Sequence, residues 1–383
     1  MAGSSEFAKI HADMLLDGTK TRSKQEIQEF LDSVGANLSF SASSDRVIFS
    51  GSVLEKHFDK LLTLIAEVLT EPIFPAKELA ILKKREQGAL LLEARDTRTQ
   101  ASIALSRMLF PHKHPNCSDT TDESKVVLEK ITRSALLDYH KKIIDNSSLV
   151  LSVAGDLEPK NIFATIERRF KKVPVNKITL PTFDASATTE AQTVMLPIPH
   201  KSSIDYMIGI ATGITDSDAD YAPLLLGVRV LGNASGFTGR LMETVREKEG
   251  LTYGVYSYLS GFTAHIDGCF ATWATFAPEL FEKGKAGVVR EIKKIVETGV
   301  TDDEAKKHSE LYDASFRVRL SNSGALARAA HDVIVSGKSI SHLDNFPKKM
   351  LSVSASEVNR VIKKYIQLDK LSSSAAGPVD VIG

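Results

Sequence analysis

Two stretches that follow one pattern decide the fold of this chain. ITRSALLDYHKKIIDNSSLVLSVAGDL spans residues 131–157, and VSASEVNRVIKKYIQLDKLSSSAAGPV spans residues 353–379. The two stretches align without a gap at an offset of 222 residues (353 − 131). Each copy predicts a helix, a short loop and then a strand that ends in Ala-Gly. The hydroxyls of Thr132 and Ser354 are suited to cap these helices, because a hydroxyl can satisfy a free N–H group at a helix start.

A second internal match supports the duplication. Residues 30–53 resemble residues 245–271, since both predict the end of a helix, a glycine, a strand, a turn and a second strand. Gly35 and Gly250 stand where the helices stop, which is the usual position of a left-handed residue. A repeat this long indicates paired domains, because solenoid repeats span only about 20–50 residues. The sequence therefore predicts two homologous α+β domains.

The boundary between these domains is visible in the composition. Residues 174–192 are rich in Pro, Thr, Ser and Ala and lack helical periodicity, which is typical of a linker. We therefore expect domains at 1–173 and 193–383. The second opens with predicted strands at Thr193–Ile198 and Ile204–Thr212. The matching segment of the first domain would precede residue 1, so that domain is expected to lack its two opening strands.

Composition excludes several classes of protein. The 383 residues contain 48 Lys and Arg against 48 Asp and Glu, and a net charge of zero argues against nucleic-acid binding. No apolar run has the roughly 18–20 residues that a membrane span needs. Two cysteines, Cys117 and Cys269, cannot form a disulfide framework or a cysteine zinc cluster. The first residues show neither the basic nor the apolar region of a signal peptide.

Candidate metal-binding groups are few. The ten histidines form neither H-E-x-x-H nor H-x-x-E-H. His112, His114 and Cys117 have a spacing that could contact one metal ion, although the Pro-rich sequence around them favours a plain loop between helices. Glu86 and Glu93 are two helical turns apart and share a face. Such a pair could bind a metal or do acid–base work, whereas a solvated helix face produces the same pattern.

A glycine-rich segment in the second half opens a predicted helix. It contains Gly232, Gly236 and Gly239, and it could cradle an anion at the helix N-terminus or simply give the helix a flexible start. Arg246 follows in the last turn of that helix, where a cation complements the helix dipole. Tyr253 is expected in the next strand, for which tyrosine has a good propensity. Considered alone, both residues have adequate structural roles.

Taken together, four segments resemble one family. Residues 237–253 resemble the segment of the pitrilysin and mitochondrial-processing-peptidase family of zinc peptidases that carries its substrate-binding arginine and tyrosine. Residues 14–23 resemble the stretch after the family's zinc motif, 154–156 the end of its first domain, and 299–304 a helix start in its second. The resemblance covers nearly the whole chain. It implies an α+β fold of two homologous α/β rolls that form a half-clamshell.

The family's zinc motif is lost. Its H-x-x-E-H falls on residues 9–13, where Lys9 replaces the first histidine, Ala12 the glutamate base and Asp13 the second histidine. A catalytic zinc needs about three protein ligands and an open position. Lys9 adds a positive charge that repels a metal ion, and Ala12 cannot take a proton from water. The resemblance therefore implies that this chain binds no metal or other cofactor.

Two glutamates of the family's zinc site have counterparts. Glu93 stands at the position of the third ligand, and Glu86 at that of a supporting glutamate. An active peptidase with an unusual metal site built from His11, Asp13 and Glu93 stays open as an alternative.

The retained residues imply a partner. The family includes two-subunit enzymes in which one chain carries the zinc motif and the other the arginine–tyrosine pair. By this resemblance, Tyr253 donates a hydrogen bond to the oxyanion at the zinc of a homologous partner subunit, and Arg246 holds the carbonyl of a peptide substrate. Gly232, Gly236 and Gly239 become a substrate-contacting loop. Zinc is expected in the partner, so this chain should be inactive alone.

A second function belongs to another class. Relatives in the respiratory chain have lost peptidase function and act as scaffolds, but a pure scaffold has no reason to keep both Arg246 and Tyr253. Exported two-subunit relatives imply a periplasmic location, while cytoplasmic and mitochondrial locations stay open. The sequence identifies neither the peptide substrate nor the partner.

Overall fold

The computed structural model describes residues 5–43, 45–174, 183, 190–233 and 238–378. By packing, the chain divides into two compact units. The first unit comprises residues 1–92, 119–180 and 322–331, and the second comprises residues 93–118, 181–321 and 332–383. Residues 93–118 precede the predicted linker in the sequence, yet they pack with the second unit. No helix of the described residues is long and apolar enough to cross a membrane.

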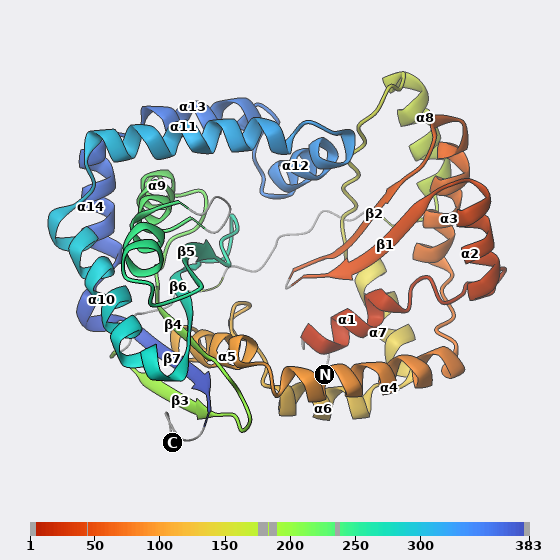
Figure 1. The fold of residues 1–383 in the computed structure, drawn as a ribbon. Coiled ribbons are helices and arrows are strands. Elements are labelled where there is room, and N and C mark those ends of the chain that lie inside the picture. The colour runs from red at the N-terminus through yellow and green to blue at the C-terminus, as the bar shows by residue number, and fades with distance from the viewer. Residues whose placement is uncertain (1–4, 44, 175–182, 184–189, 234–237, 379–383) are drawn as a thin grey trace. The chain divides into compact units, whose positions relative to one another are not determined.

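The first unit is mostly helical. Its elements in chain order are α1 (Ser5–Asp13), α2 (Lys24–Ser33), β1 (Asn37–Ala42), β2 (Val47–Ser52), η1 (Glu55–His57), α3 (Phe58–Thr70), α4 (Ala76–Glu93), α6 (Thr121–Lys130), α7 (Arg133–Asp145) and α8 (Pro159–Phe170). Strands β1 and β2 form a two-stranded antiparallel sheet (Figure 1). The core forms because α3 carries apolar residues every three or four positions, and these are buried: Leu61, Leu62, Ile65, Val68 and Leu69.

The second unit is built on a five-stranded sheet. Its elements are α5 (Thr97–Leu109), β3 (Thr193–Pro197), β4 (Ile204–Ala211), α9 (Tyr221–Leu231), η2 (Met242–Lys248), β5 (Gly254–Ser260), β6 (Cys269–Phe276), η3 (Pro278–Leu280), α10 (Phe281–Thr298), α11 (Asp302–Arg319), α13 (His342–Ser352), α14 (Ala355–Tyr365), η4 (Leu368–Lys370) and β7 (Ser372–Gly377). Helix α12 (Ser323–Val335) is divided between the units. The strand order is β3-β7-β4-β6-β5, with β3 parallel to β7 and the other pairs antiparallel.

Both faces of this sheet are covered. Helices α9, α10 and α14 bury one face in the main apolar core, and α5 covers the other face beside β4 and β7 (Figure 1). Helix α5 is anchored by polar contacts: the Thr97 hydroxyl donates to Asp205 Oδ2 (2.5 Å), and the Ser374 hydroxyl donates to the Ala101 carbonyl (2.7 Å). Burial on both sides explains why every residue of β4 is buried.

Local signals in the sequence are confirmed. The hydroxyls of Thr132 and Ser354 cap α7 and α14 by accepting backbone N–H groups of Ala135 and Glu357. Gly35 and Gly250 have φ angles of 58° and 62°, which is the left-handed region expected after a helix. The predicted opening strands of the second half are β3 and β4.

One predicted strand is wrong. Residues 149–155 match β7 at the 222-residue offset, but they form no strand, and Val153 is 37% exposed. The physical reason is pairing: β7 lies between β3 and β4, and the described residues of the first unit hold no counterpart of either strand. A backbone without a neighbour cannot form a ladder. The described residues of the first unit form two strands against five in the second, and no pair of opening strands is among them, as expected.

Candidate functional site

The structure brings Arg246 and Tyr253 together. Arg246 lies in η2, which has π-helical hydrogen bonding, such as the Glu249 N–H donating to the Thr244 carbonyl (3.0 Å). Tyr253 lies immediately before β5, one residue short of the predicted strand. The guanidinium carbon of Arg246 is 5.6 Å from the centroid of the Tyr253 ring, a cation–π distance. Short π-helical segments are frequent at functional sites.

The Tyr253 side chain faces solvent. It is 85% exposed, and its hydroxyl has no hydrogen-bond partner in the part of the chain that the structure describes. The backbone around it is held, because the Thr252 hydroxyl donates to the carbonyls of Gly254 (2.9 Å) and Thr275. The phenol hydroxyl is therefore available to donate to a bound molecule from a fixed position.

A largely exposed ion-pair network, of which only Glu291 is buried, holds the end of η2. Arg290 of α10 donates to Glu249 Oε1 (2.5 Å) and to Glu291 Oε1 (3.2 Å). Val245 and Leu251 point into the main core of the unit on either side of this contact. The turn between Arg246 and Tyr253 is thus tied to α10 by charge and to the core by apolar packing.

The glycine-rich segment stands against the same edge strand. The Gly232 carbonyl accepts the Ser257 N–H of β5 (3.1 Å). Gly239 has a φ of 111°, and a Cβ there would lie 2.8 Å from the Gly232 Cα, so the two glycines close the stem of the loop. Two of the three predicted loop glycines thus lie beside β5, and Gly236 lies outside the described residues.

The degenerate metal site of the first unit is occupied by its own cations. The Lys9 ammonium donates to Glu86 Oε2, and Arg85 Nη2 lies 3.0 Å from Glu86 Oε1. Arg85 Nη2 also lies 3.5 Å from Asp13 Oδ2. Burial raises the pKa of Glu86, but the Lys9 and Arg85 contacts outweigh it and the pKa is lowered. Both oxygens of this carboxylate are therefore engaged.

The residues at this site do not fit a zinc ion. Burial lowers the pKa of Lys9, but the hydrogen bond to Glu86 and nearby carboxylates outweigh it, so the pKa is raised and the ammonium persists. Ala12 is buried and supplies no base, and Glu93 ends α4 half-buried. Among the described residues, no three His, Cys, Asp or Glu side chains are placed to hold a metal.

His11 belongs to the core rather than to this site. Its Nε2 lies 3.0 Å from His140 Nδ1, while His140 Nε2 donates to the Leu69 carbonyl (2.9 Å). Its ring also packs against Tyr139 and Phe74. Burial and the neighbouring His140 lower the pKa of His11 to about 3. The structure therefore does not join His11 with Asp13 and Glu93 in the alternative metal site.

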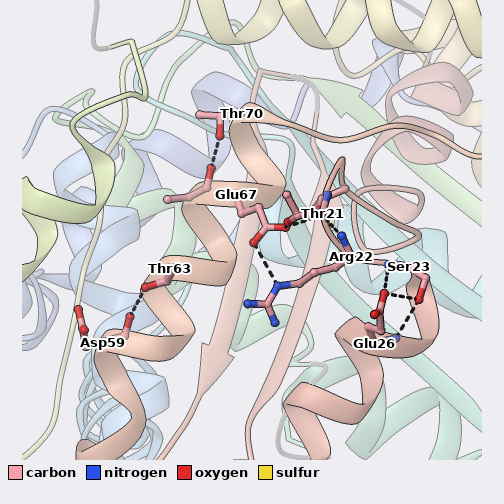
Figure 2. Close-up of polar contacts among 10 residues, drawn as sticks. Thr21, Arg22, Ser23, Glu26, Asp59, Thr63, Glu67 and Thr70 are labelled. Carbon is pink, nitrogen blue, oxygen red and sulfur yellow. Dashed lines mark hydrogen bonds and ion pairs between the residues drawn. The ribbon is translucent and has the colours of Figure 1, made fainter.

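The segment after the degenerate motif is fixed by one carboxylate. Glu67 of α3 accepts the hydroxyls of Thr19 and Thr21, the latter at 2.5 Å, and the Arg22 Nε at 3.2 Å (Figure 2). The following helix α2 starts with a reciprocal cap between Ser23 and Glu26, also drawn in Figure 2. This part of the family-like sequence thus has a structural role.

The loop that contains His112, His114 and Cys117 also has a structural role. The Asn116 N–H donates to His114 Nδ1 (3.1 Å), so Nε2 carries the proton that reaches Asp267 Oδ1 (2.8 Å). His114 and Asp267 are both buried. The contacts pin this loop to the connection between β5 and β6, and they leave no imidazole lone pair on His114 for a metal.

Sequence reasoning missed Arg98 of α5. Its guanidinium carbon lies 4.2 Å from the Trp273 ring centroid and 5.4 Å from that of Tyr256. Arg98 precedes these aromatic residues by more than 150 positions, so spacing along the chain gave no signal for the contact. Only the packing of α5 on the second unit reveals it.

Fold and site together define a zinc-peptidase-like chain in which Lys9, Ala12 and Asp13 stand at the expected metal-motif positions and Arg246 lies beside Tyr253. Residues 7–109 match the family model of insulinase, peptidase family M16, and residues 130–311 match that of the peptidase M16 inactive domain. The chain belongs to this family, which confirms the resemblance.

Similar proteins agree with this assignment. The non-peptidase homolog YmxG of Helicobacter pylori is 23% identical over 96% of this chain and 83% of its own length. The probable mitochondrial-processing peptidase subunit beta of Arabidopsis thaliana is 20% identical over 96% of this chain and 69% of its own. The crystal structure of a peptidase M16 inactive domain from Pseudomonas fluorescens has a TM-score of 0.84 at 22% identity, covering 99% of this chain and 91% of that one. This last likeness confirms the fold.

Proposed function

We propose that this chain is the non-catalytic, substrate-binding subunit of a heterodimeric zinc endopeptidase that cleaves peptides or unfolded segments. The observation that carries the proposal is the pairing of Arg246 and Tyr253 at the start of an edge strand, with the phenol hydroxyl exposed and without a partner among the described residues. A solvent-facing aromatic ring has no packing role that would explain its position.

The chemistry of the pair suits a peptide carbonyl. The Tyr253 hydroxyl can donate to an oxygen on which negative charge develops during acyl transfer. The Arg246 guanidinium, stacked on the ring, adds positive charge beside that hydroxyl and can hold a neighbouring carbonyl. We infer that both groups act on a peptide bound to the zinc-bearing partner, and that Gly232 and Gly239 let its backbone approach β5.

At the degenerate metal site, the described side chains offer no base that could activate water for peptide hydrolysis. Lys9 and Arg85 neutralise Glu86, and Ala12 replaces the base. This combination supports a division of labour between two subunits: substrate binding here, water activation in the partner.

Reconstitution tests the proposal. The chain is mixed with a homologous subunit from the same genome that carries an intact H-x-x-E-H, and cleavage of a fluorogenic peptide is measured for each chain and for the mixture. We expect the mixture to exceed the sum of the separate activities by at least about tenfold, the effect of adding one positioned donor at minimum.

A mixture that is no more active than the zinc-bearing chain alone would contradict the proposal. If the two chains still co-elute in that case, the scaffold function becomes the better account. Size-exclusion chromatography of the same mixture separates these outcomes.

A further inference from the structure

A second guanidinium, that of Arg98, is connected to the Tyr253 segment through the ring of Trp273. Gly254 follows Tyr253, and a Cβ on Gly254 would lie 3.0 Å from Trp273 Cζ3. The same ring also contacts Arg98, whose guanidinium carbon lies 4.2 Å from the Trp273 ring centroid. Tyr253, Gly254, Trp273 and Arg98 therefore form a connected series within the second unit.

Arg98 is held in place by ring contacts, and its N–H groups are available for hydrogen bonding. Its guanidinium is held over Trp273 and Tyr256, whose ring centroids are 4.9 Å apart. The side chain is exposed and makes no hydrogen bond or ion pair within the described part of the chain. Five N–H donors of a planar fork are thus presented to solvent from an aromatic platform, which lowers the entropy lost when they bind an anion.

Buried polar contacts support the platform. The Trp273 indole N–H donates to Asp205 Oδ1 (2.7 Å), and Thr97, the residue before Arg98, donates to Asp205 Oδ2 (2.5 Å). One carboxylate of β4 therefore orients both the ring and the first turn of α5. Its negative charge at the indole N–H also makes the ring face more attractive to a cation.

The elements that carry the two arginines, η2 and α5, pack on opposite faces of the sheet at β5. Val255 of β5 packs in the main core with η2, whereas Tyr256 packs on the α5 face with Trp273. Successive residues of an extended peptide also point to opposite sides. A peptide lying along the start of β5 would thus present one side chain toward Arg246 and Tyr253 and an adjacent one toward Arg98.

We infer that Arg98, stacked on Trp273 and Tyr256, is a specificity residue that binds an acidic side chain of the peptide held at Arg246 and Tyr253. The inference rests on the proposed function, because it needs a peptide at that pair. A carboxylate fits the planar fork through two parallel hydrogen bonds, and the aromatic platform shields the pair from water on one side.

Peptide binding by the isolated chain tests the inference. The probes are fluorescein-labelled peptides of one neutral sequence in which a single glutamate or glutamine is moved through each position. Fluorescence anisotropy gives Kd for each probe. We expect one position at which glutamate binds about three- to tenfold more tightly than glutamine, the range of a partly exposed charge pair.

Two variants locate the effect. Arg98→Gln should remove the preference for glutamate while leaving the affinity for the neutral peptide unchanged. Arg95→Gln makes the same charge change at an exposed arginine without an aromatic contact among the described residues, and should retain the preference. Thermal melts of both variants verify folding, which an exposed side chain should not affect.

The outcomes are distinguishable. Equal binding of glutamate and glutamine peptides, or equal loss of preference in both variants, overturns the inference and leaves the proposed function intact. Failure of every probe to bind, with binding also absent for peptides in excess, overturns the proposed function and the inference with it.

Discussion

Tyr253 and Arg246 would interact with a bound peptide in different ways. The phenol hydroxyl is a neutral donor, so its bond to a carbonyl strengthens only as that oxygen becomes negative. The guanidinium carries its charge throughout and binds a carbonyl before and during the reaction. The 5.6 Å stacking distance keeps the two groups adjacent without a hydrogen bond between them that would occupy the hydroxyl.

Kinetics of the reconstituted pair should separate these roles. Tyr253→Phe keeps the ring and removes the hydroxyl, and we expect kcat to fall by about 10²–10³. Arg246→Ala should raise KM more than it lowers kcat, since it removes binding common to the ground and transition states. Steady-state assays with a fluorogenic peptide provide the measurement, and unchanged constants in both variants would show that the pair is structural.

The contacts of Lys9 lead to a prediction about metal content. Because its ammonium is bonded to Glu86 and its pKa is raised, a divalent cation would have to displace a fixed positive charge. The purified chain should therefore contain well below one zinc per molecule. Elemental analysis after dialysis checks this, and the zinc-bearing partner treated identically is the positive control. Stoichiometric zinc in this chain would refute the prediction.

The buried histidine pair makes stability depend on pH. Burial lowers the pKa of both His11 and His140, that of His11 to about 3, so both stay neutral in the folded state while the unfolded chain protonates near 6.5. Stability is complete above about pH 6.5 and falls as pH drops from there toward 3, by up to about 1.4 kcal/mol per pH unit for each histidine.

Urea titrations between pH 7.5 and 4.5, a range chosen around the usual histidine pKa of about 6.5, measure this slope. His11→Leu should reduce the slope of the unfolding free energy against pH by the contribution of about one proton. His112→Leu, at an exposed residue, should leave the slope unchanged. His308, whose pKa burial and nearby cations lower to about 4, keeps part of the slope in every variant. An identical slope for His11→Leu and the wild type would count against the buried pair.

At the scale of elements, the glycine-rich segment depends on backbone shape rather than on side chains. Gly239 combines a φ of 111° with a 2.8 Å approach to the Gly232 Cα, so no other residue fits without moving the loop stem away from β5. Substitution there acts on the position of the loop beside β5 and on stability together.

Two alanine substitutions should therefore have opposite signs. Gly239→Ala is expected to destabilise the fold by about 1–3 kcal/mol, through backbone strain and the clash with Gly232. Gly88→Ala, in the exposed middle of α4 where a Cβ meets nothing within 4 Å, should stabilise it by about 0.5–1 kcal/mol. Chemical denaturation of both variants gives the comparison, and a neutral Gly239→Ala would contradict the strain.

Elements also show what a sequence can predict. The caps Thr132 and Ser354 and the glycines Gly35 and Gly250 depend on neighbours within a few residues, and local chemistry predicted all four. The failed strand at residues 149–155 depends on partners elsewhere, because β propensity becomes a strand only through pairing.

The candidate site follows the same rule. Arg246 and Tyr253 are seven residues apart across a single turn, so a local motif was enough to find both. Arg98 reaches Trp273 only because α5 packs on the second sheet, and the contact of His114 with Asp267 likewise joins distant segments. The offset of 222 residues places helix α5 over residues 319–331, but nothing in the periodicity says which sheet either segment covers.

At the scale of the whole molecule, sequence order and packing do not coincide. Residues 93–118 pack with the second unit, and residues 322–331, at nearly the corresponding place in the second half, are assigned to the first. Each half of the sequence thus gives a helical segment to the unit built mainly from the other half.

A half-chain should reveal this exchange. Residues 190–383 alone lack α5, so one face of the sheet, including Met207, Ala271 and Trp273, loses its cover. We expect this fragment to bind a hydrophobic dye strongly or to aggregate. A longer fragment of residues 93–383, which includes α5, should do neither. Dye fluorescence and light scattering make the comparison. A soluble, non-binding fragment would show that α5 is dispensable.

The exchange of α5 also bears on the history of the chain. After a gene duplicates in tandem, either copy can usually be deleted, inverted or recombined while the other survives. Here the second copy does not encode α5, the helix that covers one face of its five-stranded sheet, so a deletion at the midpoint leaves the second unit incomplete. The two copies are therefore inherited together. If one copy changes by drift, as at the motif of residues 9–13, that copy still cannot be deleted without damage to the fold.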